Sequence, residues 1–253
     1  MVSQGAVVFM AISGAIAFLL PIGLIVWFKR RYGASLKVFF IGALTFFVFA
    51  QLHVYVLQVN EMTKEAMQHP LWYGIYGCLM AGIFEECGRY IMMRFFMKRH
   101  HTWADGLAFG AGHGGLEAIL ITGLSSISLI VYAFAINSGT FEQLLINDDI
   151  KQALLPIQEQ LLHTPSYEWL LGGIERISAI AVQIGLSLLV LYAVKIRRPL
   201  FLLYSILLHA LFNVPAVLYQ KRIIEHAAAV EIIVALIAAV SVYWIVKAKR
   251  LFQ

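Results

Sequence analysis

Seven long apolar stretches divide this chain, and each is long enough to cross a lipid bilayer as a helix. The hydrocarbon core of a bilayer is about 30 Å thick, which a helix of about 20 residues spans. The sequence therefore predicts an all-α fold, a polytopic membrane helix bundle of about seven transmembrane helices. The stretches cover about residues 5–28, 36–58, 71–97, 104–136, 169–195, 199–219 and 226–247.

The composition agrees with a membrane protein and disfavours a soluble one. Of the 253 residues, 61% are hydrophobic and 13% are charged, whereas a soluble domain carries about 25% charged residues. A single integral-membrane domain over residues 1–253 accounts for the whole chain. The net charge of +5 requires no nucleic-acid partner, because the basic residues cluster at the ends of the apolar stretches. Membrane lipids are the expected surroundings.

The distribution of Lys and Arg predicts the orientation. Short cytoplasmic loops carry an excess of these residues. Four basic segments alternate consistently with loops that are mixed or acidic, and only the segment at 221–226 argues weakly against the pattern. We therefore expect an outside N-terminus, a cytoplasmic C-terminus and a multi-pass location in the cell membrane, in a bacterium the plasma membrane. The basic segments are 29–37, 98–101, 195–198 and 247–250, and the intervening loops are 60–70 and 137–168.

Several local features refine this topology. The outer loop 137–168 contains an amphipathic piece at 141–163, expected to break at Pro156 and to act as an ordinary connecting helix or to lie on the outer interface. The start of the chain lacks a basic region, so no cleaved signal peptide is expected. Cys78 and Cys87 lie about 13 Å apart along one helix, which is too far for a disulfide. The glycine-rich fourth stretch suggests close packing or a kink.

Charged side chains in the middle of the third apolar stretch are the strongest functional signal. Glu85 and Glu86 are adjacent, and Arg89 follows one turn later. A carboxylate at mid-membrane depth is costly, so such residues are rare and usually face a partner or a wet cavity. Either carboxylate is spaced to pair with the guanidinium of Arg89, at i,i+4 or i,i+3.

Two other predicted helices carry polar side chains at a similar depth. The fourth has His113 with Glu117 one turn later, and the sixth has His209 with Asn213 one turn later. Counted from the cytoplasmic ends, Glu85, His113 and His209 lie roughly 18, 14 and 15 Å into the membrane. Independent buried hydrogen bonds have no reason to share a depth, so the three helices are expected to form one polar site.

Each of these groups also has a structural interpretation. An intramembrane His such as His53 commonly bonds one helix to another, the Glu85–Arg89 pair can be a structural ion pair, and Asn213 can accompany a kink at Pro215. Glu175 and Arg176 lie near the outer end of the fifth helix. We interpret them as an interfacial or structural pair, with a catalytic or gating role as the less favoured alternative.

The residue types of the polar layer suit hydrolysis of an acyl bond. A glutamate can act as general base for water, a histidine can orient that water, and a second histidine with an amide can stabilise an oxyanion. Glu85, His113 and His209 could instead hold Zn²⁺. The zinc-protease spacing His-Glu-x-x-His is absent, so no motif requires a metal, and we favour a site without a cofactor.

Three motifs, in order, resemble those of the CAAX protease and bacteriocin-processing (CPBP, or ABI) intramembrane peptidases. They are Glu85-Glu86-x-x-Arg89, Phe109-x-x-x-His113 and His209-x-x-x-Asn213, and the wider pattern looks like the YhfC-type branch of that superfamily. Type II CAAX prenyl proteases are its best-known members, and PrsW-type proteases have a similar first motif. The resemblance covers a core of about residues 71–219. The family's first motif usually has three residues before the arginine, and here there are two, Cys87 and Gly88.

The resemblance implies roles for individual residues. A first-motif glutamate and His113 would activate water, and His209 with Asn213 would form the oxyanion hole. We favour Glu85 as the base, with Glu86, Arg89 and Glu117 supporting it. Members of the superfamily have been described both as metalloproteases and as metal-free glutamate proteases, so the resemblance leaves the metal open.

These observations together predict an intramembrane endopeptidase, acting on a membrane protein or a lipidated peptide. Two other classes remain open. A non-catalytic membrane receptor or immunity protein could retain this fold, because fold does not fix function. A proton-coupled transporter also places Glu, His and Arg at mid-membrane, but it would typically show repeated halves, and the sequence has no such symmetry.

Overall fold

A computed structural model describes residues 1–59 and 70–253 of the chain, and every regular element in those residues is a helix. Six helices in this part of the chain are long and apolar enough to cross a membrane, so the prediction of a multi-spanning helical protein is confirmed at that level. The helix α4 (Pro70–Ile91), which carries Glu85, Glu86 and Arg89 in its second half, is not among them. A count of seven spans and the orientation of the termini therefore stay predictions.

The internal contacts divide the chain into two compact units. One comprises residues 1–20 and 118–177, and the other residues 21–117 and 178–253. The single domain over 1–253 and the core over 71–219 stay predictions. The predicted loop at 60–70 lies outside the described residues, apart from the first residue of α4.

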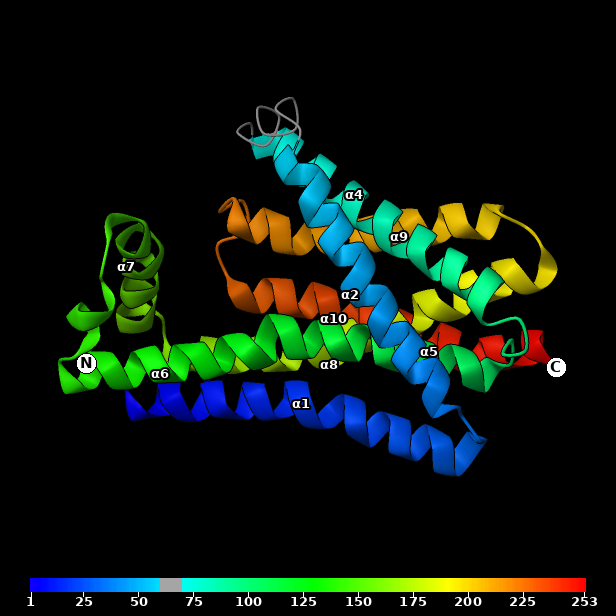
Figure 1. The fold of residues 1–253 in the computed structure, drawn as a ribbon, viewed down its shortest axis with the longest axis horizontal. Coiled ribbons are helices and arrows are strands. Elements are labelled where there is room, and N and C mark those ends of the chain that lie inside the picture. Colours follow the sequence, from blue (N-terminus) through cyan, green and yellow to red (C-terminus); the bar gives the residue numbers. More distant parts are fainter. Residues whose placement is uncertain (60–69) are drawn as a thin grey trace. The chain divides into compact units, whose positions relative to one another are not determined.

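The larger unit contains all the polar residues singled out on the third, fourth and sixth apolar stretches. In it α4 lies against α9 (Leu200–Gln220) and also against α2 (Leu36–Val59), while α10 (Ala227–Ala248) contacts α9 (Figure 1). The helix α5 (Trp103–Ala118) and the second part of α8 (Ser166–Ile196) complete the surroundings of the site. An apolar cluster of α8, α9 and α10 packs this side of the unit: Ala179, Val182, Leu186, Phe212, Val230, Val234 and Ala238.

The smaller unit has its own apolar core. It contains the first part of α1 (Gln4–Tyr32), α6 (Leu124–Ser138) and α7 (Asp148–His163), with the short 3-10 helix Phe141–Leu144 between the last two. Val2, Ala6, Met10, Ala133 and Leu161 form the core.

Helix ends in this chain follow recognisable capping chemistry. Gly33 ends α1 with a positive φ of 70°, its N–H bonds to the Lys29 carbonyl, and the next N–H bonds to the Phe28 carbonyl. The bond from Gly33 to Lys29 is that of the αL capping motif, which glycine favours because it has no Cβ. Thr102 and Asp105 cap the start of α5 reciprocally: the Thr102 N–H donates to the Asp105 carboxylate, and the Asp105 N–H donates to the Thr102 hydroxyl.

The helix boundaries correct the sequence prediction in two places. The amphipathic piece does not break at Pro156, because α7 runs through that residue. The third apolar stretch ends as an α-helix at Ile91 and continues as a π-helix over Met92–Phe96.

The glycines of the fourth stretch allow close packing. A Cβ on Gly112 would overlap the backbone carbonyl of Phe39, so α5 and α2 approach each other as two bare backbones there. The predicted irregularity of this stretch is a π-helical segment, Ile119–Gly123, between α5 and α6.

Candidate active site

Helix α4 supplies two carboxylates with different environments. Glu86 is fully buried, whereas Glu85 retains 8% exposure. Adjacent residues on a helix point in directions about 100° apart, so the two carboxylates face different neighbours. This difference gives the two adjacent glutamates separate environments.

The Arg89 guanidinium is fully buried and is held by α8. Its NH1 atom donates to the Gln183 backbone carbonyl and to the Ser187 hydroxyl, both at 2.9 Å, and its NH2 atom donates to the Gln183 side-chain oxygen. The Nε atom lies 3.4 Å from Oε1 of Glu86, and NH2 lies 3.9 Å from Oε2 of Glu85. One guanidinium therefore faces both carboxylates while a neighbouring helix fixes its position.

Gln183 connects this arrangement to α5. Its side-chain NH₂ group donates to the carboxylate of Glu117, while its oxygen accepts from Arg89. An amide can donate and accept at once, so Gln183 bridges the Arg89 cation and the Glu117 anion.

His113 approaches Glu85 from α5. Its Nε2 atom lies 2.9 Å from Oε2 of Glu85, and its ring is fully buried. The ring of Phe46 meets it edge-on at 5.3 Å, and the ring of Phe109 stacks at 6.3 Å. Within the described part of the chain, Nδ1 of His113 has no hydrogen-bond partner.

His209 approaches both carboxylates from α9. Its Nδ1 atom lies 2.7 Å from Oε1 of Glu86, and its Nε2 atom lies 3.9 Å from Oε2 of Glu85. Ser205, one turn earlier on α9, donates its hydroxyl to the other oxygen of Glu86. Glu86 is therefore bonded at both oxygens, whereas Oε2 of Glu85 lies between two imidazoles.

The close contact of α4 and α9 depends on Gly82. A Cβ at this position would lie 2.7 Å from the carbonyl oxygen of Ile206 and 3.6 Å from Cβ of His209. Only a glycine lets the two helices approach closely enough for Glu86 to bond Ser205 and His209 together.

The structure thus brings together six of the residues singled out from the sequence, from three separate helices: Glu85, Glu86, Arg89, His113, Glu117 and His209. Asn213 is half-buried one turn beyond His209 and makes no hydrogen bond to another described residue. The ring of His53 stacks on Phe84 at 5.7 Å.

Glu175 and Arg176 pair with each other by a direct hydrogen bond. Arg176 is buried at 7% exposure. This pair fits the structural interpretation, and a gating role stays untested.

Three side chains of the site were missed from the sequence: Gln183, Ser187 and Ser205. Ser205 precedes His209 by one helical turn, a spacing that places both on one face and that could have revealed it. Gln183 and Ser187 show the same spacing inside an otherwise apolar span, but nothing in the sequence connects them to Arg89.

The donor types suit zinc, but their arrangement does not match a built zinc site. Ligands at 2.0–2.2 Å in a tetrahedral site stand about 3.3–3.5 Å apart, whereas Glu85 lies 2.9 Å from His113 and 3.9 Å from His209. A zinc-bound imidazole normally donates its other N–H to an acceptor, and His113 has none among the described residues. In that part of the chain no group of three His, Cys, Asp or Glu side chains is placed to hold a metal ion.

The fold and this cluster define a class of protein: a multi-spanning helical membrane protein with a buried carboxylate–imidazole site in its helix bundle. The chain belongs to the YhfC family, whose model, described as "YhfC intramembrane metalloprotease", matches residues 16–234. It is 93% identical to the membrane protein YhfC of Bacillus subtilis (strain 168), over the whole length of both chains. No solved structure matches it.

The comparisons confirm the predicted YhfC membership and the membrane character. The wider link to the CPBP and CAAX peptidases and the relation to PrsW-type proteases stay predictions.

Proposed function

We propose that this chain is an intramembrane endopeptidase that hydrolyses a peptide bond of a membrane protein or membrane-anchored peptide in the bacterial cell membrane. The observation that carries the proposal is the position of Oε2 of Glu85, between Nε2 of His113 at 2.9 Å and Nε2 of His209 at 3.9 Å. One carboxylate oxygen facing two ring nitrogens is an arrangement for handling the proton of a small polar molecule. The description of the YhfC family as intramembrane metalloproteases supports the same class of reaction.

Glu85 and Glu86 have different roles in the proposed reaction. Glu85 retains some exposure and accepts the proton of a water molecule as general base. Glu86 is buried and bonded by Ser205 and His209, so it orients His209 instead of reacting. Arg89 faces both carboxylates and offsets one of their two negative charges.

His113 orients the attacking water. Its Nε2 atom lies within hydrogen-bond distance of Glu85, so a water bound by Glu85 also lies near this ring. The rings of Phe46 and Phe109 hold the imidazole and keep bulk water away from it. Excluding bulk water strengthens the electrostatic interactions inside the site.

His209 and Asn213 stabilise the oxyanion. The water oxygen bonds to the scissile carbonyl carbon, and the carbonyl oxygen becomes negative. His209 acts here as the imidazolium, with a proton on each ring nitrogen: Nδ1 donates to Glu86, while Nε2 and the NH₂ group of Asn213 donate to that oxygen. The C–N bond then breaks, and the proton held by Glu85 passes to the leaving amine.

A substrate must present its carbonyl to this site in extended form, because a helix keeps its carbonyls in internal hydrogen bonds. The substrate segment therefore unwinds locally inside the membrane or begins at a helix end.

No step of the proposed hydrolysis uses a metal, because the arrangement of the described site residues does not match a zinc site. Glu85, His113 and His209 are the side chains that would hold zinc if the site rearranged. The metalloprotease description of the family disagrees with this choice, and the zinc content of the protein decides between them.

A membrane proteomics comparison tests the function. Membranes of cells with the wild-type chain are compared with membranes of cells with Glu85→Gln, and new peptide N-termini are quantified. We expect a defined set of membrane-protein cleavages that disappears in the variant. Identical sets of N-termini in both strains would contradict the proposal.

A further inference from the structure

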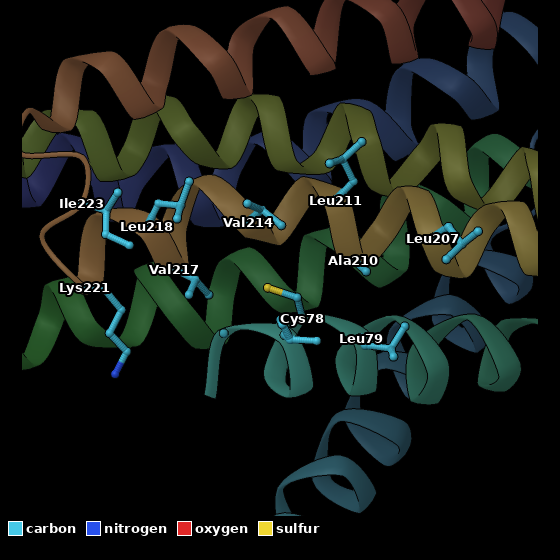
Figure 2. A pocket seen from close by; sticks show the side chains of 12 residues that line it. Cys78, Leu79, Leu207, Ala210, Leu211, Val214, Val217, Leu218, Lys221 and Ile223 are labelled. Atoms are coloured by element: carbon cyan, nitrogen blue, oxygen red, sulfur yellow. The ribbon is translucent and has the colours of Figure 1, made fainter. Parts of the chain in front are cut away.

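An apolar groove follows the line of contact between α4 and α9, outside the polar site. Its volume is about 670 Å³. Figure 2 shows Cys78 and Leu79 on α4 facing a row of side chains that begins at Leu207 on α9 and ends at Lys221, just beyond that helix. Among the described residues of the lining, Lys221 is the charged one.

Two glycines set the helix spacing along this groove. Besides the contact at Gly82, a Cβ on Gly74 would lie 2.9 Å from a methyl group of Val217. Beside the contact of α4 and α9 at these glycines, larger side chains of both helices point outward. Ile75 on α4 is 51% exposed and Leu211 on α9 is 59% exposed. In a protein that spans the bilayer, such a face meets the hydrocarbon phase.

The size and chemistry of the groove select among apolar occupants. A helix is about 10 Å wide, so it could lie over the groove but not within it, between two helices that approach as closely as α4 and α9 do at Gly82. An extended peptide would be narrow enough, but its backbone N–H and C=O groups would lack partners here, at a large cost in an apolar medium. A hydrocarbon chain is narrow and has no polar groups to satisfy.

The positive charge of Lys221 at one end of the groove indicates which headgroup the bound hydrocarbon chain carries. Lys221 directly follows the last residue of the 21-residue helix α9, so it lies where a spanning helix leaves the hydrocarbon. From Leu207 to Lys221 the groove is about 21 Å long at 1.5 Å per residue. One leaflet is roughly 15 Å thick, so the groove is long enough for an acyl chain that reaches from the headgroup level to the middle of the bilayer. A lysine ammonium binds phosphate as a point charge, and basic residues at this level attract anionic lipids.

We propose that this groove binds one acyl chain of an anionic phospholipid, with the phosphate at Lys221 and the chain lying along α4 and α9 toward Leu207. The bound lipid stabilises the same helix pair that carries Glu85, Glu86 and His209. The inference goes beyond the proposed peptidase activity and does not depend on it.

Cys78 provides a direct test, because it lines the groove and lies on the same helix as Cys87, which does not. The purified full chain is kept in detergent micelles, and phosphatidylglycerol or phosphatidylcholine is added in increasing amounts. Alkylation of both cysteines by a small maleimide is followed by peptide mass spectrometry, with Cys87 as the internal reference.

We expect phosphatidylglycerol to protect Cys78 at about fivefold lower amounts than phosphatidylcholine, the factor that corresponds to the ~1 kcal/mol contributed by one lysine near an anionic surface. Lys221→Gln should remove this preference. Lys195→Gln, which changes a lysine at the end of another helix, should keep it. Leu211→Trp, which fills the groove, should protect Cys78 without added lipid.

Several results would overturn the proposal. They are equal protection by the two lipids, no protection by either, or a preference that survives Lys221→Gln. Protection by glycerol phosphate alone would indicate a phosphate site without an acyl chain, and stronger protection by an apolar transmembrane peptide would indicate a helix-binding surface.

Discussion

Nδ1 of His209 lies 2.7 Å from Oε1 of Glu86, so Glu86 holds this histidine in place. Oε2 of Glu85 instead faces Nε2 of His113 and Nε2 of His209. This contact assigns different tasks to two adjacent residues of identical chemistry. It also makes the consequences of their substitution different.

Glu85→Gln should lower cleavage by about 10²–10⁴, the usual contribution of a general base, because glutamine keeps the size of the side chain but cannot take a proton. Quantified membrane-protein N-termini report the cleavage, and thermal unfolding in micelles should show little change. Glu175→Gln is the control, since the hydrogen-bond partner of Glu175 is Arg176.

Glu86→Gln should instead destabilise the protein, because it removes a buried charge near Arg89 and an acceptor of Ser205 and His209. Removing one partner of a buried ion pair costs about 3–5 kcal/mol. Near-wild-type cleavage by both glutamate variants, together with an inactive Glu175→Gln, would show that the active site lies elsewhere.

Gln183→Leu should destabilise the protein by about 1–3 kcal/mol, because Arg89 and Glu117 each lose one buried hydrogen bond. Chemical unfolding in micelles measures the change. Gln152→Leu makes the same substitution at an exposed position of α7 and should have little effect. Equal stability of the two variants would mean that Gln183 does not hold Arg89.

Gly82→Ala should separate α4 from α9 and reduce both stability and cleavage, since its Cβ would meet the Ile206 carbonyl at 2.7 Å. Gly77→Ala lies on the same helix with nothing within 4 Å of the new Cβ. That change should be neutral or stabilising by up to about 1 kcal/mol, the gain in helix propensity. The melting temperature should therefore fall for Gly82→Ala and not for Gly77→Ala, and an equal fall in both variants would argue against a tight α4–α9 contact.

Asn213→Ala should reduce turnover by about 10²–10³, the usual loss for one oxyanion donor, and leave stability unchanged, because the side chain bonds no other described residue. Asn137→Ala provides the opposite pattern. Asn137 bonds the backbone of Val2 at 2.7 and 2.9 Å, so its loss should affect the melting temperature and not the cleavage per folded molecule. An unstable Asn213→Ala protein would point to a structural role.

Purified protein should contain much less than one zinc per chain, and a chelator should not abolish cleavage, because His113 lacks the acceptor that a zinc-bound imidazole uses. Elemental analysis of wild-type protein and of the His113→Ala variant measures this. One zinc per chain, lost in the variant together with activity, would establish the metalloprotease mechanism.

Much of the site could be predicted from the sequence. Charged residues inside apolar stretches are costly enough to be noticed singly, so Glu85, Glu86, Arg89, His113 and His209 stood out without any structure. Their similar depth along three helices follows from the constant helical rise. Gln183 and Ser187 did not stand out, because uncharged polar side chains are less unusual in such helices.

The sequence by itself determined that the chain forms long membrane helices and that their polar groups lie at one depth, because apolar length and helical rise are local properties. Only the tertiary structure decided which glutamate holds His209 and which faces His113, since the rotation and separation of the helices set these contacts. That separation depends on Gly82, where the missing side chain lets α4 touch the backbone of α9. Local pattern cannot report such a contact, because its partner lies more than a hundred residues away in the chain.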